Sequence, residues 1–353
     1  MVLIMALIGT VITSCSNADE PLSEPTPSDE GVVYEVSLNL VGEYTNVTEE
    51  PLSRVGEAPK KYYGINVYCM KTDGTENSYG HYAYGVFDNV ADMKITLLGG
   101  YKYKFECTSA TEGDDNFFDS SSYILDPFQT SDQHTSYSNG NIYIYYFFSK
   151  VNINKFITSQ SEYLSGIKSG RTAYQSESGD NVYYKPYTRS YPRTDRYYGE
   201  ITDFIPSNGG VANIPMKRTV FGLKIIANGV PDGTLSWSIS ELYNNKTCTG
   251  SDIVEETTIY TFYDVRDCWS IDTYTENFTI NFTWTRSNGY EQKFSKEFTS
   301  KRNIMTTINV NLKGGANEVS LGIEEDDTPM GNEGVNVDYD GGDLNDTPVN
   351  PQE

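Results

Sequence analysis

Apolar and polar residues alternate along most of this chain, which is the pattern of β-strands with one face in a core. In residues 33–40, Tyr34, Val36, Leu38 and Leu40 fall on one face, and polar side chains fall on the other. A glycine pair at 99–100 separates two alternating runs and predicts a hairpin. The first half of the chain is thus predicted to hold strands at residues 33–40, 65–69, 93–97, 101–107 and 141–148.

A second set of alternating runs begins near residue 211. Its clearest member is a hairpin in which residues 278–285 return through Ser287-Asn288-Gly289 into residues 290–298. Helical spacing is scarce, and only residues 161–169 are expected to form a short helix. Short strands with turn signals at this spacing are typical of β-sandwiches.

The fold class predicted is therefore all-β, with two tandem β-sandwiches and flexible acidic termini. We expect a lipoprotein signal peptide at residues 1–14, an acidic flexible linker at 15–31, an N-terminal β-sandwich at 32–210, a C-terminal β-sandwich at 211–315 and an acidic tail with a candidate donor strand at 316–353.

The 353 residues carry a formal net charge of −23, with 49 acidic and 26 basic side chains. The acidity is concentrated at the ends, because residues 1–31 hold five acids and residues 322–353 hold ten, with no base in either stretch. Such a balance argues against a nucleic-acid partner, since a phosphate backbone requires a basic surface. Acidic tails of this kind bury little apolar surface and are expected to be flexible.

The first residues indicate where the protein goes. An apolar stretch at 1–13 is too short to span a bilayer but suits the core of a signal peptide. It ends Ile12-Thr13-Ser14-Cys15, which resembles the bacterial lipobox, and this resemblance implies cleavage before Cys15 and a lipid on its thiol. The acids that follow resemble an export signal of Bacteroidetes surface lipoproteins. The alternative is an ordinary secretory signal with a chance cysteine.

Catalytic and metal-binding motifs are lacking in the sequence, so we expect no enzyme, no cofactor and no metal site. The two histidines, His81 and His134, have no neighbouring nucleophile or acid in the sequence and are interpreted as packing or surface residues. Acidic residues at 338–346 resemble calcium ligands but lack the glutamate that would complete an EF-hand loop, so a solvated tail is the preferred interpretation.

Tyrosine and arginine gather at residues 183–198, against the acidic trend of the chain. Tyrosine rings stack on sugar faces, and arginine pairs with acidic groups. A ligand patch is one hypothesis, and a loop packed between the two domains is the preferred alternative. The residues assigned to the candidate patch are Tyr183, Tyr184, Tyr187, Arg189, Tyr191, Arg193 and Arg196.

Four cysteines besides Cys15 remain for the body of the protein. Cys69 and Cys107 share the parity of apolar neighbours, so both are expected to face the core. A disulfide between them is one candidate, although burial alone accounts for both residues.

The lipobox, the two all-β domains and the local runs EPLSR at 50–54, MKRTVFGLK at 216–224 and KRN at 301–303 together resemble the fimbrillin-like surface lipoproteins of Bacteroidetes. That family includes polymerising pilins, tip subunits and fimbrial anchors. The resemblance implies two transthyretin-like β-sandwiches, a place on the outer membrane at the cell surface, and partners that are other fimbrial subunits or a second copy of the chain.

In polymerising members of this family, an Arg-specific protease cuts after an arginine that follows the first strand, and a neighbour's C-terminal strand fills the groove. The resemblance implies that Arg54 is the processing residue. It also implies a donor strand at 334–340, in which Val335, Val337 and Tyr339 share one face. Without the cut, the protein would remain tethered by lipid and act as an anchor.

A second hypothesis keeps the protein at the cell surface but changes its role. It is a glycan-binding lipoprotein of a polysaccharide-uptake system, whose target would be a glycan rather than a host protein or another subunit. Exposed aromatic rings on one face would favour this role over the fimbrial one.

Overall fold

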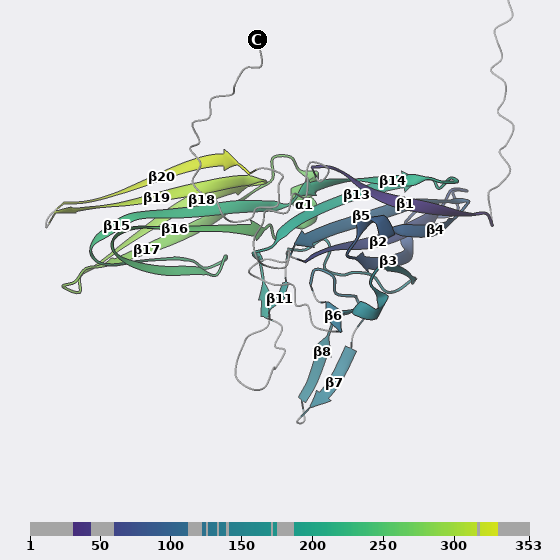
Figure 1. Ribbon diagram of the computed structural model, residues 1–353, viewed down its shortest axis with the longest axis horizontal. Helices are drawn as coiled ribbons and strands as arrows, with labels where there is room; N and C mark the ends of the chain where they lie inside the picture. Colours follow the sequence, from purple (N-terminus) through teal and green to yellow (C-terminus); the bar gives the residue numbers. More distant parts are fainter. Residues whose placement is uncertain are drawn as a thin grey trace, which may run out of the picture.

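The computed structural model describes residues 31–43, 60–111, 122–124, 126–132, 134–138, 141–170, 172–174, 187–315 and 318–330. Regular structure in this part of the chain is almost entirely β-strand, and its single α-helix is α1 (Val265–Ser270). The strands form two bodies along the long axis of the molecule (Figure 1). The all-β fold class and its two β-sandwiches are thereby confirmed.

The first body contains an eight-stranded sheet with the order β10-β3-β2-β5-β13-β14-β1-β4. Its strands are β1 (Val33–Gly42), β2 (Lys61–Lys71), β3 (Gly80–Phe87), β4 (Lys94–Leu98), β5 (Tyr101–Thr111), β10 (Lys155–Thr158), β13 (Asp195–Phe204) and β14 (Val211–Arg218). Among the described residues, three two-stranded sheets and two short 3-10 helices lie between these strands in the sequence. They are β6 (Tyr123–Ile124) with β9 (Phe148–Ser149), β7 (His134–Ser138) with β8 (Asn141–Tyr145), β11 (Thr172–Tyr174) with β12 (Tyr187–Arg189), and the 3-10 helices Val90–Asp92 and Lys150–Asn152.

Strand β14 turns this sheet into two layers, because its two ends pair with different strands. Its residues from Val211 to Met216 run parallel to β1, whereas Lys217 and Arg218 pair with β13. Apolar side chains from both layers fill one core between them. That core includes Val36, Leu38, Ile65, Val67, Ile95, Phe105 and Ile214.

The second body consists of β15 (Val220–Ile239), β16 (Asn244–Thr261), β17 (Thr275–Thr285), β18 (Glu291–Lys301), β19 (Ile304–Gly315) and β20 (Glu318–Pro329). Residues 228–233, Asn-Gly-Val-Pro-Asp-Gly, have the composition of a turn between two strands, but the structure shows one long strand, β15, bent in its middle. The N-terminal half of β15 pairs in parallel with β19, and its C-terminal half pairs antiparallel with β17. The bent hairpin of β15 and β16 therefore contributes to both layers of this sandwich.

The bend depends on Gly233, which has a φ of +79°. A Cβ at this position would clash with the backbone oxygen of Thr285. Glycine is the residue that combines a left-handed backbone with such a close approach. The turn-forming residues at 228–233 therefore bend one strand and do not separate two strands.

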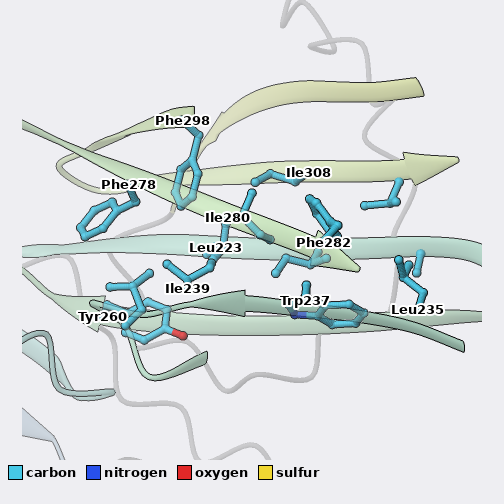
Figure 2. Close-up of a cluster of buried hydrophobic side chains, with 14 of the residues drawn as sticks. Leu223, Leu235, Trp237, Ile239, Tyr260, Phe278, Ile280, Phe282, Phe298 and Ile308 are labelled. Atoms are coloured by element: carbon cyan, nitrogen blue, oxygen red, sulfur yellow. The ribbon is translucent and has the colours of Figure 1, made fainter. Parts of the chain in front are cut away.

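Alternating residues of β15, β17 and β19 point into the second core, as Figure 2 shows for Leu223, Ile280 and Ile308. The predicted hairpin is confirmed, with Phe278 opposite Phe298 across β17 and β18. Burying these large aromatic and aliphatic side chains, at about 1.5–3 kcal/mol each, holds the layers together.

Three expectations about organisation change. The second sandwich extends beyond residue 315 into the expected acidic tail at 316–353, because Glu318–Pro329 pairs with β19 as β20. Val211–Arg218 pairs with β1 and β13, so the boundary between the two sheets falls at Thr219 instead of near residue 210. The expected helix at 161–169 is a series of turns. The physical reason is pairing with residues 129–131: the Ser165 N–H donates to Gln129 O, and the Tyr163 carbonyl accepts from the Ser131 N–H, groups that a helix would use for its own hydrogen bonds.

Candidate functional site

The first strand occupies a slot between two other strands. β1 pairs antiparallel with β4 from Val33 to Ser37 and parallel with β14 from Ser37 to Gly42. A further backbone hydrogen bond runs from Leu38 N to Met93 O at 2.8 Å. Removing β1 would leave unpaired backbone groups on both sides, which is the condition for β-augmentation by another strand.

The side chains of β1 confirm the predicted face. Val36, Leu38 and Leu40 are buried, with exposed fractions of 0%, 4% and 3%. They pack into the core between the layers of the first body. Any strand that replaces β1 must therefore supply apolar side chains at every second position.

A polar clasp holds the end of β1. Glu43 directly follows the strand, and its carboxylate accepts hydrogen bonds from Arg302 Nη1 at 2.8 Å and from the backbone N–H of Arg218 at 2.9 Å. Arg302 lies in the turn between β18 and β19. The clasp therefore connects the first strand of the first body to the second body.

Nearby polar contacts fix the two bodies against each other. Arg218 is buried; its Nε donates to Asp195 Oδ1 at 2.7 Å within the first body, and its Nη1 donates to Asn303 Oδ1 at 3.2 Å in the second. The Thr219 N–H donates to Arg196 O at 2.8 Å, and the Thr261 hydroxyl donates to Thr194 O at 2.6 Å. Because these groups are buried and paired, the junction is a structured interface rather than a loose linker.

Several predicted residues lie outside the described part of the chain: Cys15, Arg54, Tyr183, Tyr184, Val335, Val337 and Tyr339. The sequence position of Arg54 still has a structural consequence. β1 ends at Gly42 and β2 begins at Lys61, so a cut after Arg54 leaves β1 joined to the remaining chain only by non-covalent contacts.

Among the residues of the predicted tyrosine and arginine patch whose side chains the structure describes, Tyr191, Arg193 and Arg196 do not share one exposed surface. Arg196 is 1% exposed, and its guanidinium donates to Thr108 Oγ1 and to three backbone carbonyls. Burial lowers the pKa of this guanidinium. Arg196 is thus a structural residue, and its assignment to the patch is corrected. For Tyr187 and Arg189, only the backbone is described, in β12.

Tyr191 is the patch residue that reaches a surface hollow. Its ring meets Phe278 edge-on at a centroid distance of 5.1 Å, and Tyr263 lies at 6.2 Å. Burial, and then the charge of Glu276, raise the pKa of the Tyr191 phenol. The neighbouring Arg193 is partly buried. A hollow of about 330 Å³ is lined by Ser190, Tyr191, Glu241, Tyr243 and Tyr263.

Four of those lining residues are absent from the predicted patch: Ser190, which lies beside Tyr191 in the sequence, and three from distant parts of the chain. Glu241 and Tyr243 come from the turn between β15 and β16, and Tyr263 follows β16. They are far from Tyr191 in sequence and belong to no motif. The sequence shows Tyr243 as an aromatic residue next to the end of a strand, which could mark it as exposed. No sequence pattern near Tyr243 indicates that it lies close to Tyr191.

A second polar cluster surrounds Glu106, which is buried in β5. Its carboxylate is 2.7 Å from Lys104 Nζ and 2.5 Å from Lys168 Nζ, and it accepts a hydrogen bond from the Tyr68 hydroxyl at 2.8 Å. Burial acts to raise the pKa of Glu106, but the two lysines outweigh it, and the pKa lies below its ordinary value. The lysines balance the charge of the Glu106 carboxylate within the cluster, and we interpret the cluster as structural.

His81 stacks beside this cluster. Its ring lies 4.5 Å from the Tyr163 ring and 4.4 Å from the Tyr68 ring, measured between centroids. Burial lowers the pKa of His81, which favours its neutral form. The interpretation of His81 as a packing residue agrees with this geometry, while the side chain of His134 lies outside the described residues.

The register of β2 and β5 corrects the candidate disulfide. Cys69 lies opposite Tyr103, and Cys107 lies opposite Ile65. The two cysteines are therefore offset by four residues, roughly 13 Å along the strands, whereas a disulfide requires Cα atoms within about 7 Å. All four described cysteines are free thiols. Cys107 is fully buried, as expected, and Cys69 is partly buried.

In the part of the chain that the structure describes, no group of three or more His, Cys, Asp or Glu side chains is placed to hold a metal ion. Within the same residues, no helix has the length and apolar character needed to cross a membrane.

No family model and no curated protein matches this chain. Among solved structures, it is similar to the fimbrial anchor protein Mfa2 from Porphyromonas gingivalis, at 10% identity and a TM-score of 0.34, covering 85% of this chain and 99% of that one. A putative cell adhesion protein from Bacteroides eggerthii gives 10% identity and a TM-score of 0.35, covering 86% and 98%.

Putative polysaccharide binding proteins from Bacteroides thetaiotaomicron are also similar, at 8% identity and a TM-score of 0.31, covering 78% of this chain and 92% of that one. Identities and TM-scores of this size do not transfer a function. The case for function therefore rests on the residues of this chain.

Proposed function

We propose that this protein is a non-enzymatic surface lipoprotein that forms or anchors fimbria-like adhesive structures. In this proposal, lipid on Cys15 holds it to the outer membrane, and its partners are other fimbrial subunits or further copies of itself. The solved structures above include proteins titled as a fimbrial anchor and a cell adhesion protein.

One observation carries the proposal: β1 fills a slot whose two sides, β4 and β14, would both lose hydrogen-bond partners without it. A strand in that position is replaceable, because the slot supplies backbone partners and side-chain pockets to any extended segment with the right alternation. Val335, Val337 and Tyr339 repeat the spacing of Val36, Leu38 and Leu40. The C-terminal tail is thus a matched donor for the slot.

Whether the chain is cut after Arg54 decides between two roles, a polymerising subunit and a membrane anchor. The residue lies between Cys15, which would carry the lipid, and β2, where the remaining body begins. A cut after Arg54 would leave β1 and the lipid on Cys15 without a covalent connection to the body, so that loss of β1 from its slot would also release the body from the membrane. A cut protein is therefore suited to polymerise, and an uncut protein is suited to anchor a fibre at the membrane.

The test is limited digestion of the lipid-free protein, residues 16–353, with an Arg-specific protease. We expect a single early cut after Arg54 by intact mass, followed by a heat-sensitive ladder on an unheated gel. The matched control is Arg54→Ala, which should stay uncut and monomeric. A protein cut at Arg54 that remains monomeric would overturn strand exchange, and one that resists the protease would overturn the polymerising role.

The alternative from the sequence, a glycan-binding lipoprotein of a polysaccharide-uptake system, remains a prediction. It needs exposed aromatic side chains on one surface. Tyr191, Tyr243 and Tyr263 meet that requirement better than the patch that the sequence indicates.

A further inference from the structure

We propose that the hollow lined by Ser190, Tyr191, Glu241, Tyr243 and Tyr263 binds the ring of a neutral saccharide. The inference adds a ligand to the adhesive surface role proposed above and relies on that role for its biological meaning. Its chemistry is independent of strand exchange, because no residue of β1, β4 or β14 lines the hollow.

The hollow forms where three separate segments of the chain meet at the second body. Ser190 and Tyr191 precede β13, the turn between β15 and β16 supplies Glu241 and Tyr243, and Tyr263 follows β16. Its volume of about 330 Å³ is at the small end of the range for ligand pockets, about 300–1,000 Å³. That size suits one or two sugar rings rather than a long chain.

Packing beneath the turn presents its side chains outward. Leu242 is fully buried in the second core, so the residues on either side of it, Glu241 and Tyr243, face solvent. Tyr243 is 56% exposed although it is a large aromatic residue. It also has a φ of +50°, a left-handed backbone that tyrosine rarely adopts.

Tyr191, another lining residue, also combines a left-handed backbone with a partly exposed ring. Its φ is +66°, and its ring is only partly buried against Phe221 and Phe278. Two non-glycine residues with left-handed backbones thus line one hollow. Strained positions persist where the surrounding structure fixes them, and they concentrate at functional sites.

The lining has the chemistry of a sugar site. Phenol rings offer flat apolar faces to the C–H faces of a pyranose, and their hydroxyls donate or accept hydrogen bonds. The Ser190 hydroxyl and the Glu241 carboxylate add partners for sugar hydroxyls. A few polar groups among aromatic walls are typical of sites that orient a small ligand.

The charges select a neutral ligand. Glu241 is an exposed carboxylate that lines the hollow. It repels the carboxylates of uronic and sialic acids. A cationic side chain is a weaker candidate, because an ion pair with an exposed carboxylate such as Glu241 contributes little in water.

The experiment measures glycan binding by the lipid-free protein, residues 16–353. The protein is applied to an array that holds neutral and acidic glycans, and the neutral hits are titrated calorimetrically as free oligosaccharides. Tyr243→Ala should weaken binding at least tenfold. The matched control is Tyr290→Ala, which removes a 59%-exposed tyrosine from the turn between β17 and β18 and should leave affinity unchanged.

The proposal is overturned if no neutral glycan binds, if only acidic glycans or basic peptides bind, or if Tyr243→Ala and Tyr290→Ala have equal effects. Thermal unfolding of both variants checks that the body is intact, and Glu241→Gln provides a second variant with an unchanged backbone. Tyr243→Ala should still form the ladder after the Arg54 cut. Loss of sugar binding and loss of assembly are therefore separate results.

Discussion

Glu43 and Arg302 join the first strand to the second body: Arg302 Nη1 lies 2.8 Å from each carboxylate oxygen of Glu43. The two residues are 259 positions apart in the chain. Because the carboxylate also accepts the Arg218 N–H, its position is fixed from two directions. The end of β1 is therefore secured by the protein's other half as well as by its own sheet.

Glu43→Ala tests this clasp. It removes the side-chain acceptor of the Arg218 N–H and leaves Arg302 Nη1 with the Arg218 carbonyl at 3.3 Å, so the free energy of unfolding should fall by about 1–3 kcal/mol. Chemical denaturation with urea measures the loss. The control is Glu291→Ala, which breaks an exposed pair with Lys293 and should cost less than about 0.5 kcal/mol. Equal losses would show that the clasp adds nothing.

Arg196→Met tests the correction to the predicted patch. The change removes the donors that satisfy the carbonyls of Gly166, Ile167 and Ser169, and we expect a loss of at least about 3 kcal/mol in unfolding free energy. Lys293→Met, at a side chain 72% exposed, is the control and should be nearly neutral. An Arg196→Met protein as stable as the wild type would contradict the structural role assigned to Arg196.

Gly233→Ala tests the bend in β15. Alanine would have to adopt a φ of +79° and would clash with the Thr285 carbonyl. Gly289→Ala is the matched control, because its φ is +84° but no atom lies within 4 Å of the added Cβ. We expect a loss of about 1–2 kcal/mol for Gly289→Ala, from backbone strain alone, and at least twice that for Gly233→Ala. Thermal unfolding that ranks the two equally would contradict this account of the bend.

Glu106 should make stability depend on pH. Its pKa in the folded protein lies below the ordinary value of 4.5, so it stabilises the fold above that pH. The contribution is lost as the pH falls through the folded pKa, where the carboxylate takes a proton in both states. The gap in unfolding free energy between wild type and Glu106→Gln should therefore be larger at about pH 7 than at about pH 3. A gap that stays constant would contradict the assignment.

The sequence predicts the strands well where one face is buried and the partner is near in the chain. Residues 33–40 and the hairpin of 278–285 with 290–298 correspond to β1, β17 and β18, because alternation directly reflects burial on one side. Prediction fails where distant contacts decide. The helix expected at 161–169 is displaced by backbone pairing of Tyr163 and Ser165 with residues 129–131, and no local pattern predicts that contact.

The candidate site follows the same rule. The apolar face of β1 is readable from its residues, but its pairing with β14 is parallel and long-range, and Glu43 finds Arg302 only in the folded chain. The hollow needs Tyr191, Tyr243 and Tyr263 from three segments. The gathering of tyrosine and arginine at residues 183–198 indicates Tyr191, but its neighbours in the hollow can be identified only from the fold.

Strand exchange through the slot of β1 is tested most directly by changing the donor strand and leaving the slot intact. After the Arg54 cut, the ladder of Val337→Asp is compared with that of Val349→Asp, a control in the same acidic tail outside the alternating run. The account predicts that Val337→Asp stays monomeric, because a carboxylate cannot enter the positions that Val36, Leu38 and Leu40 vacate. Val349→Asp should assemble normally. A Val337→Asp protein that forms the same ladder as wild type would contradict the account.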